Sequence, residues 1–164
     1  MNEQAAVLAT PYLTFYLGGE ECAAGILRIR EIVHYDTALT RIPATPAWIR
    51  GAMNLHGTVV PVVDLAVKFG LPATAITKRT CVLMVEVELQ GERTAIGIVV
   101  DAVSRAVDLD AIEPAPPGES RVPGEFLLGV GRLGKQSLPI LDLDRLLSLD
   151  ELLRLTATTA GEPS

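Results

Sequence analysis

Residues 49–65 read IRGAMNLHGTVVPVVDL, and a related stretch, LLGVGRLGKQSLPILDL, follows at residues 127–143. The two align without a gap. The identical pairs are Gly51 with Gly129, Leu55 with Leu133, Pro61 with Pro139, Asp64 with Asp142 and Leu65 with Leu143. Four further positions hold similar apolar pairs: Ile49 with Leu127, Val60 with Leu138, Val62 with Ile140 and Val63 with Leu141. The pattern is that of a β-hairpin unit used twice.

A second echo supports duplication of the whole chain. Residues 12–25 read YLTFYLGGEECAAG, and part of this stretch returns later in the same order. The matched pairs are Leu17 with Leu89, Gly19 with Gly91, Glu20 with Glu92, Gly25 with Gly97 and Ile26 with Ile98. Two repeated stretches that occur in the same order along the chain favour duplication over chance matching, even in a chain rich in Val and Gly. We therefore expect one domain at 12–150, divided into subdomains at about 12–75 and 76–148, with tails at 1–11 and 156–164. Exchange of the N-terminal and C-terminal elements between the subdomains is left open.

The apolar residues recur mostly with a period of two, which predicts strands. Gly18-Gly19 and Gln90-Gly91 each join two such runs into a hairpin, and each hairpin is expected to have one wet and one dry face. Short helical pieces are expected at 64–70 and over 144–155, and a long loop at 114–124. The spacing of Ile26, Ile29 and Val33 fits either a helix or a strand that ends in a helical turn. The fold class is all-β, mainly antiparallel, with a few short helices.

Such units of about 65 residues are marginal alone, so two of them should pack together and share a core. The expected architecture is a pair of small barrels related by a pseudo-twofold internal repeat. The groove between them should be apolar, and exposed apolar grooves mark binding sites.

Composition excludes several functions. The chain has 164 residues, 49% of them hydrophobic, a net charge of −6 and a pI of about 4.9. This acidic balance argues against nucleic acid or anionic lipid as main partners. No apolar run is long enough to cross a membrane, and the N-terminus lacks the basic start of a secretory signal, so a cytoplasmic location is expected. Cys22 and Cys81 are far apart in sequence and suit a reducing compartment as small buried residues.

Catalytic candidates are few, and no metal or cofactor motif occurs. Asp64 and Asp142 are better explained as helix N-caps in two equivalent places than as paired catalytic carboxylates. An enzyme built in the inter-barrel groove around His56, Glu31 and Cys81 stays open as an alternative. Glu31 lies in an apolar run, and it is either a solvated charge or a partly buried acid paired with the 54–56 loop.

These residues resemble a known family. Ile42-Pro43, Pro46 and the run from Ile49 to Leu65 closely resemble the signature of CheW-like chemotaxis coupling proteins. Supporting matches are FYLGGE at 15–20, Glu31-Ile32, GIVVDAV at 97–103, Ile112-Glu113-Pro114 and Leu141-Asp142-Leu143. The resemblance covers about residues 12–148, nearly the whole chain.

The resemblance implies two SH3-like, five-stranded β-barrel subdomains around a hydrophobic interface, with no catalysis, cofactor or metal. It implies a cytoplasmic adaptor that couples the tips of methyl-accepting chemoreceptors to the regulatory domain of a CheA-type histidine kinase in membrane-associated arrays, without inserting into the membrane. By motif position the receptor-binding residues would be Ile29, Glu31, Thr80, Cys81, Ile96, Gly97 and Ile98. The kinase-binding residues would be Arg41, Pro43, Gly51, Asn54, Leu55 and His56. The sequence fits equally an accessory regulator of a pilus or second-messenger system, because such a regulator would bind its partners in the same way.

One departure from the family stands out. The signature usually reads Asn-Leu-Arg-Gly, and this chain has His56 in place of the arginine and Ala66 at a second basic position. A guanidinium is always charged and can hold a carboxylate in a fork, whereas imidazole is mostly neutral at pH 7. We therefore expect a specialised coupling protein with its own partners, or one with weakened coupling.

Overall fold

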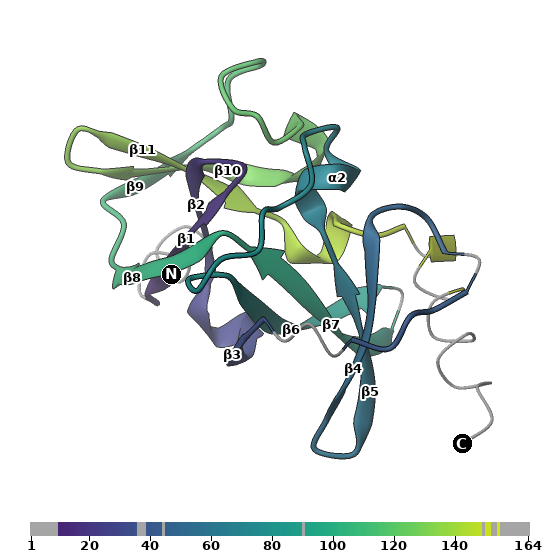
Figure 1. Ribbon diagram of the computed structural model, residues 1–164. Coiled ribbons are helices and arrows are strands. Elements are labelled where there is room, and N and C mark those ends of the chain that lie inside the picture. The colour runs from purple at the N-terminus through teal and green to yellow at the C-terminus, as the bar shows by residue number, and fades with distance from the viewer. Residues whose placement is uncertain are drawn as a thin grey trace.

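The computed structural model describes residues 10–35, 39–43, 45–89, 91–148, 150, 151 and 154. Its strands form two sheets (Figure 1). The six-stranded sheet has the order β8 (Ala102–Val107), β1 (Tyr12–Leu17), β2 (Glu20–Gly25), β11 (Gln136–Leu141), β10 (Leu127–Leu133) and β9 (Ala111–Glu113). The five-stranded sheet has the order β3 (Ile29–His34), β6 (Cys81–Leu89), β7 (Glu92–Val100), β5 (Thr58–Val63) and β4 (Ile49–Leu55). The predicted all-β, mainly antiparallel fold is confirmed.

Each sheet joins a hairpin from one half of the chain to a hairpin from the other. The β1–β2 hairpin lies in the sheet that holds β8 to β11, and the β6–β7 hairpin lies in the sheet that holds β3 to β5. The two joints are the parallel pairs β11–β2 and β5–β7, whereas the other pairs are antiparallel. One sheet has six strands where five were expected, because the short β9 adds an edge next to β10. The division into subdomains at residue 75 stays a prediction.

The repeated hairpins β4–β5 and β10–β11 share the same local geometry. Both have a register shift just before a glycine, Gly51 in one and Gly129 in the other. A Cβ atom at Gly51 would lie 2.6 Å from the carbonyl oxygen of Thr40, and one at Gly129 would lie 2.6 Å from that of Glu113. A neighbouring backbone therefore approaches each hairpin too closely for any side chain.

Both hairpins also end in the expected aspartate cap. The Asp64 side chain accepts a hydrogen bond from the backbone N–H of Ala66 and begins helix α2 (Leu65–Lys68). The Asp142 side chain accepts one from the N–H of Asp144 and begins the 3-10 turn η3 (Leu143–Arg145). The predicted helix over 64–70 is confirmed as this shorter α2.

Other short elements differ from expectation. The 3-10 turn η1 (Ile26–Arg28) precedes β3, so this region is a helical turn followed by a strand, the reverse of the order considered from the sequence. The 114–124 loop is confirmed up to the 3-10 turn η2 (Gly124–Phe126). Ser148 and Glu151 exchange two hydrogen bonds that cap a C-terminal helix, whose described residues are 150, 151 and 154. The rest of the expected helix and most of both tails lie outside the described residues.

The central core, a cluster of buried apolar residues, draws members from both sheets. It includes Leu13, Phe15 and Leu17 of β1 and Leu83, Ile96 and Ile98 of β6 and β7, all at most 6% exposed. A smaller cluster, which includes Tyr12, Ala23 and Ile140, lies on the six-stranded sheet alone, and another, which includes Val62, Val82 and Met84, lies on the five-stranded sheet alone. The shared core expected from the sequence is therefore present, with a second small core in each sheet.

The expectation of one wet and one dry face per hairpin is wrong for β1. Tyr12 and Thr14 are as buried as the residues that alternate with them. Tyr12 packs in the smaller cluster of its sheet, while the Thr14 hydroxyl donates to the carbonyl of Arg105 in β8. The first half of β6 is likewise buried on both faces, and only Glu86 and Glu88 keep the expected wet side.

An ion pair ties η1 to η3 beside β6. Arg28 donates to both carboxylate oxygens of Asp144 and to the carbonyl of Glu86, and Asp144 also accepts the N–H of Glu88. Partial burial alone would raise the pKa of Asp144, but the hydrogen bonds from Arg28 and Glu88 outweigh it and the pKa is lowered. Both side chains are more than a third exposed, so the link is held at least partly in water.

Replacing Gly51 or Gly129 by alanine should destabilise the protein by roughly 2–4 kcal/mol, because the new methyl group meets a backbone oxygen in both hairpins. Urea unfolding measures the change. Gly25→Ala is the matched control, since nothing lies within 4 Å of a Cβ built there and its φ is −59°. Equal stability of all three variants would contradict the close approach.

Asp144→Asn should lower stability at neutral pH. Because the folded-state pKa of Asp144 is lowered, its contribution is present above the unfolded value of about 3.9 and is lost as the pH falls through the folded value. The urea midpoints of the variant and the wild type should therefore converge in acid. A difference that is the same at pH 7 and in acid would contradict this assignment.

Candidate partner-binding surfaces

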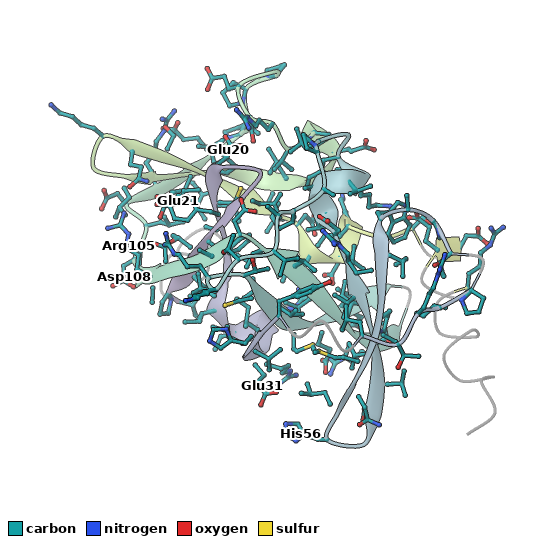
Figure 2. All side chains as sticks on the ribbon, in the orientation of Figure 1. Glu20, Glu21, Glu31, His56, Arg105 and Asp108 are labelled. Carbon is teal, nitrogen blue, oxygen red and sulfur yellow. The ribbon has the colours of Figure 1, made fainter. Side chains whose placement is uncertain are left out.

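Glu31 and His56 meet at the tip of the β4–β5 hairpin. His56 Nε2 lies 3.3 Å from Glu31 Oε1, so the pairing considered from the sequence is confirmed (Figure 2). His56 and Gly57 both have positive φ, 52° and 85°, as a two-residue hairpin turn requires. The Asn54 side chain accepts the N–H of Gly57 at 3.0 Å and fixes this turn. The imidazole is thus held on a short, braced turn.

The hydrogen-bonding capacity of the Glu31–His56 pair is only partly used. His56 is 76% exposed at its side chain and Glu31 is 39% exposed. The second carboxylate oxygen of Glu31 is shielded from solvent and has no hydrogen-bond partner in the described part of the chain. A neutral imidazole offers Glu31 one N–H, whereas a guanidinium could reach both oxygens in a fork.

The expected kinase-side residues fall at two ends of one hairpin. Arg41, Pro43 and Gly51 line a concavity of about 610 Å³ beside the base of β4, together with residues 45–47. Asn54, Leu55 and His56 lie at the tip, where Asn54 and His56 are exposed and Leu55 is half-buried. Gly51 has no side chain to offer a partner, and the backbone of Thr40 lies where its Cβ would be. The six residues therefore fall into two groups, one at the base of the β4–β5 hairpin and one at its tip.

The expected receptor-side residues divide by burial. Ile29, Glu31 and Cys81 keep some exposure, whereas Thr80, Ile96, Gly97 and Ile98 are buried. Ile96 and Ile98 belong to the central core, and a Cβ at Gly97 would lie 2.7 Å from Val82. The apolar seam between the sheets is thus filled here, and the open groove expected from the sequence is not found at these residues. A role for these four in receptor binding stays a prediction.

A buried polar network around Asp64 was not predicted from the sequence. The Asp64 carboxylate is fully buried and accepts hydrogen bonds from Arg50, from the N–H and hydroxyl of Thr74 and from the Ala66 N–H. Arg50 also donates to the Thr74 carbonyl. The cap role predicted for Asp64 is thus only part of what it does. A signal was present: the repeat puts Leu128 opposite Arg50, so one copy has a cation where the other has an apolar residue.

The thiols are poorly suited to catalysis. Cys22 and Cys81 are free, and burial raises the pKa of both, so neither ionises readily near pH 7. In β6, Cys81 pairs with His34, while Glu31 pairs with Met84 further along the strand. Cys81 is therefore not paired with Glu31 in the β3–β6 ladder, so this ladder places no nucleophile beside the Glu31–His56 contact.

The described residues contain no group of three or more His, Cys, Asp or Glu side chains placed to hold a metal ion. Within the same residues, no helix is long and apolar enough to span a membrane.

Comparison with known proteins gives a consistent family. A family model described as a CheW-like domain matches residues 11–151. The chain is 41% identical over 143 residues to "Chemotaxis protein CheW" of Klebsiella aerogenes, which covers 86% of this chain and 83% of that protein. It is 30% identical over 141 residues to "Probable chemotaxis protein CheW" of Rhizobium etli, covering 85% and 88%. The crystal structure of scaffolding protein TtCheW from Thermoanaerobacter tengcongensis matches with a TM-score of 0.74 and 30% identity, over 87% of this chain and 90% of that one.

Arg50→Leu, which copies the residue found in the second repeat, should cost roughly 3–5 kcal/mol, because it leaves the buried Asp64 carboxylate without its cation. Arg93→Leu is the matched control: its ion pairs with Glu86 and Glu88 are surface contacts of a side chain 66% exposed, so it should cost less than about 1 kcal/mol. Urea unfolding compares the two. An equal, small loss in both variants would contradict the importance of the Asp64 network.

Proposed function

Because the chain belongs to the CheW-like family, we propose that it is a non-catalytic adaptor in chemotaxis signalling, which couples chemoreceptor cytoplasmic tips to the regulatory domain of a CheA-type histidine kinase. The observation that carries the proposal is the likeness to a scaffolding protein over 87% of the chain, at 30% identity. The same likeness supports the two-subdomain architecture. The raised thiol pKa values argue against the alternative of an enzyme that uses Cys81.

The kinase would bind the strip formed by the base and the tip of the β4–β5 hairpin. Arg41, Pro43, Asn54 and His56 are exposed there, and Val59 adds an apolar side chain that is 42% exposed. A strip that mixes apolar and polar groups suits a transient signalling contact. Gly51 would contribute by letting the 39–43 segment lie close to β4.

The receptor would bind beside the β3–β6 ladder. Ile29, Glu31 and Cys81 offer the exposed part of this surface. The other four expected residues are buried and would set the positions of the strands rather than touch a receptor: Thr80, Ile96, Gly97 and Ile98. Binding to receptors and kinase would place the protein in the cytoplasm, at the periphery of membrane receptor arrays.

His56 would tune the kinase contact. It pairs with one oxygen of Glu31 and leaves the other without a partner among the described residues. With an arginine at this place, a fork to Glu31 would add a fixed positive charge at the hairpin tip. Histidine therefore gives a weaker, less positive tip, which fits specialised partners or weakened coupling.

The test mixes the purified chain with the regulatory domain of the CheA-type kinase and the receptor tip fragment encoded in the same genome. A ternary complex is expected, measured by size-exclusion chromatography and calorimetry. Failure to bind either partner would contradict the adaptor role.

His56→Arg should tighten kinase binding by about three- to tenfold, because a guanidinium fork to both oxygens of Glu31 replaces the single imidazole contact. In a Glu31→Gln background the same substitution should have little effect, since the carboxylate is gone. Wild-type binding already as tight as that of the arginine variant would overturn the tuning role of His56.

A further inference from the structure

A further concavity among the described residues belongs to neither surface discussed so far. It measures about 740 Å³ and lies between three segments: the β1–β2 hairpin end with Tyr16 and Gly19, the β7–β8 junction with Asp101 and Ala102, and residues 75–79. The last of these belongs to the segment that runs from α2 to β6 (Figure 1). We call this concavity the junction pocket.

The junction pocket has an excess of positive charge at its rim. Lys78 and Arg79 are both exposed, and neither charged group has an ion pair or hydrogen bond to the described residues. Asp101, the acid in the lining, is already engaged, because its Oδ2 accepts the N–H of Gly19 at 3.0 Å. In a chain of net charge −6, two unpaired cations beside a concavity form a local site for a negatively charged group.

The turn that carries the two cations is rigidly built although it has no regular secondary structure. The Thr80 hydroxyl accepts the N–H of Thr77 at 2.8 Å and donates to the carbonyl of Ala75 at 3.2 Å. The N–H of Arg79 donates to the Thr77 hydroxyl at 3.1 Å. Lys78 and Arg79 are thus presented on a braced turn, which reduces the ordering cost of binding.

The segment from α2 to β6 also packs against the β1–β2 hairpin. A Cβ at Gly18, where φ is +60°, would lie 2.8 Å from Leu71 Cδ1, so this glycine admits the close contact. Ile76, next to the pocket lining, is 41% exposed. The surface therefore offers one apolar side chain beside two cations, which fits an acidic segment that also carries apolar residues.

We propose that the junction pocket binds acidic side chains of the receptor hairpin, with Lys78 and Arg79 as the contact residues. This inference rests on the proposed adaptor function and extends the receptor surface beyond Cys81, along the chain toward residue 75. Thr80, which is 1% exposed, would be a positioning residue that holds the turn and would not contact the receptor.

The test measures binding of the receptor tip fragment to Lys78→Glu, Arg79→Glu and the double variant. Each single change should weaken binding about threefold and the pair about tenfold, since exposed charge pairs are individually weak. Raising the salt concentration should weaken the wild type more than the double variant. Lys135→Glu, the same substitution at an exposed lysine on the β10–β11 turn, is the matched control and should bind as the wild type does.

Replacing the acidic side chains of the receptor fragment by the corresponding amides supplies the other half of a double-mutant cycle. The wild-type chain should lose affinity for this fragment, whereas the Lys78→Glu, Arg79→Glu chain should lose none. For the positioning role, Thr80→Val should weaken receptor binding and speed hydrogen exchange at residues 77–80. Thr80→Ser, which keeps the hydroxyl, should restore both.

The outcomes separate this inference from the adaptor role. If the wild type binds both partners and the double variant binds the receptor fragment equally well, the junction pocket assignment is wrong and the adaptor role stands. If the double variant instead loses kinase binding, the pocket serves the other partner and the assignment is also wrong. If the wild type binds neither partner, the adaptor role fails and this inference fails with it.

Discussion

The central core holds the two sheets together, because among the described residues it is the apolar cluster to which both sheets contribute. Each sheet has only a small cluster of its own, too few residues to stabilise a unit of this size. Filling the space between the sheets has a functional cost: it removes Ile96 and Ile98 from any surface. The side chains that remain exposed for the proposed contacts lie on β3, at the β4–β5 hairpin and in the segments between strands.

The repeat in the sequence predicted the most regular parts of the structure. Matching residues gave the two hairpins with their glycines and their aspartate caps, because such positions depend on local backbone geometry. Burial on both faces of β1 escaped prediction, since Tyr12 and Thr14 look like residues of a wet face. Their burial follows from strands far along the chain, β8 and β11, whose pairing no local pattern records.

Polar partners across the fold were predicted unevenly. Glu31 stood out because a charge in an apolar run needs a partner, and it has one in His56. The partners of Asp64 were not predicted beyond the helix cap, because the cap role was a sufficient explanation for an acid at that place. The braced turn before β6 left no periodic signal at all, since its order comes from the hydroxyls of Thr77 and Thr80 rather than from a strand or helix.

The interleaving of the halves bears on how the chain reaches its native state during synthesis. The β1–β2 hairpin is synthesised before the other described strands, yet its sheet neighbours, β8 and β11, lie at residues 102–107 and 136–141. The six-stranded sheet therefore cannot be completed until almost the entire chain has been translated, and the nascent hairpin must wait with unpaired edges. A gene cut at about residue 75 would yield two fragments, each with strands of both sheets and neither with a complete sheet.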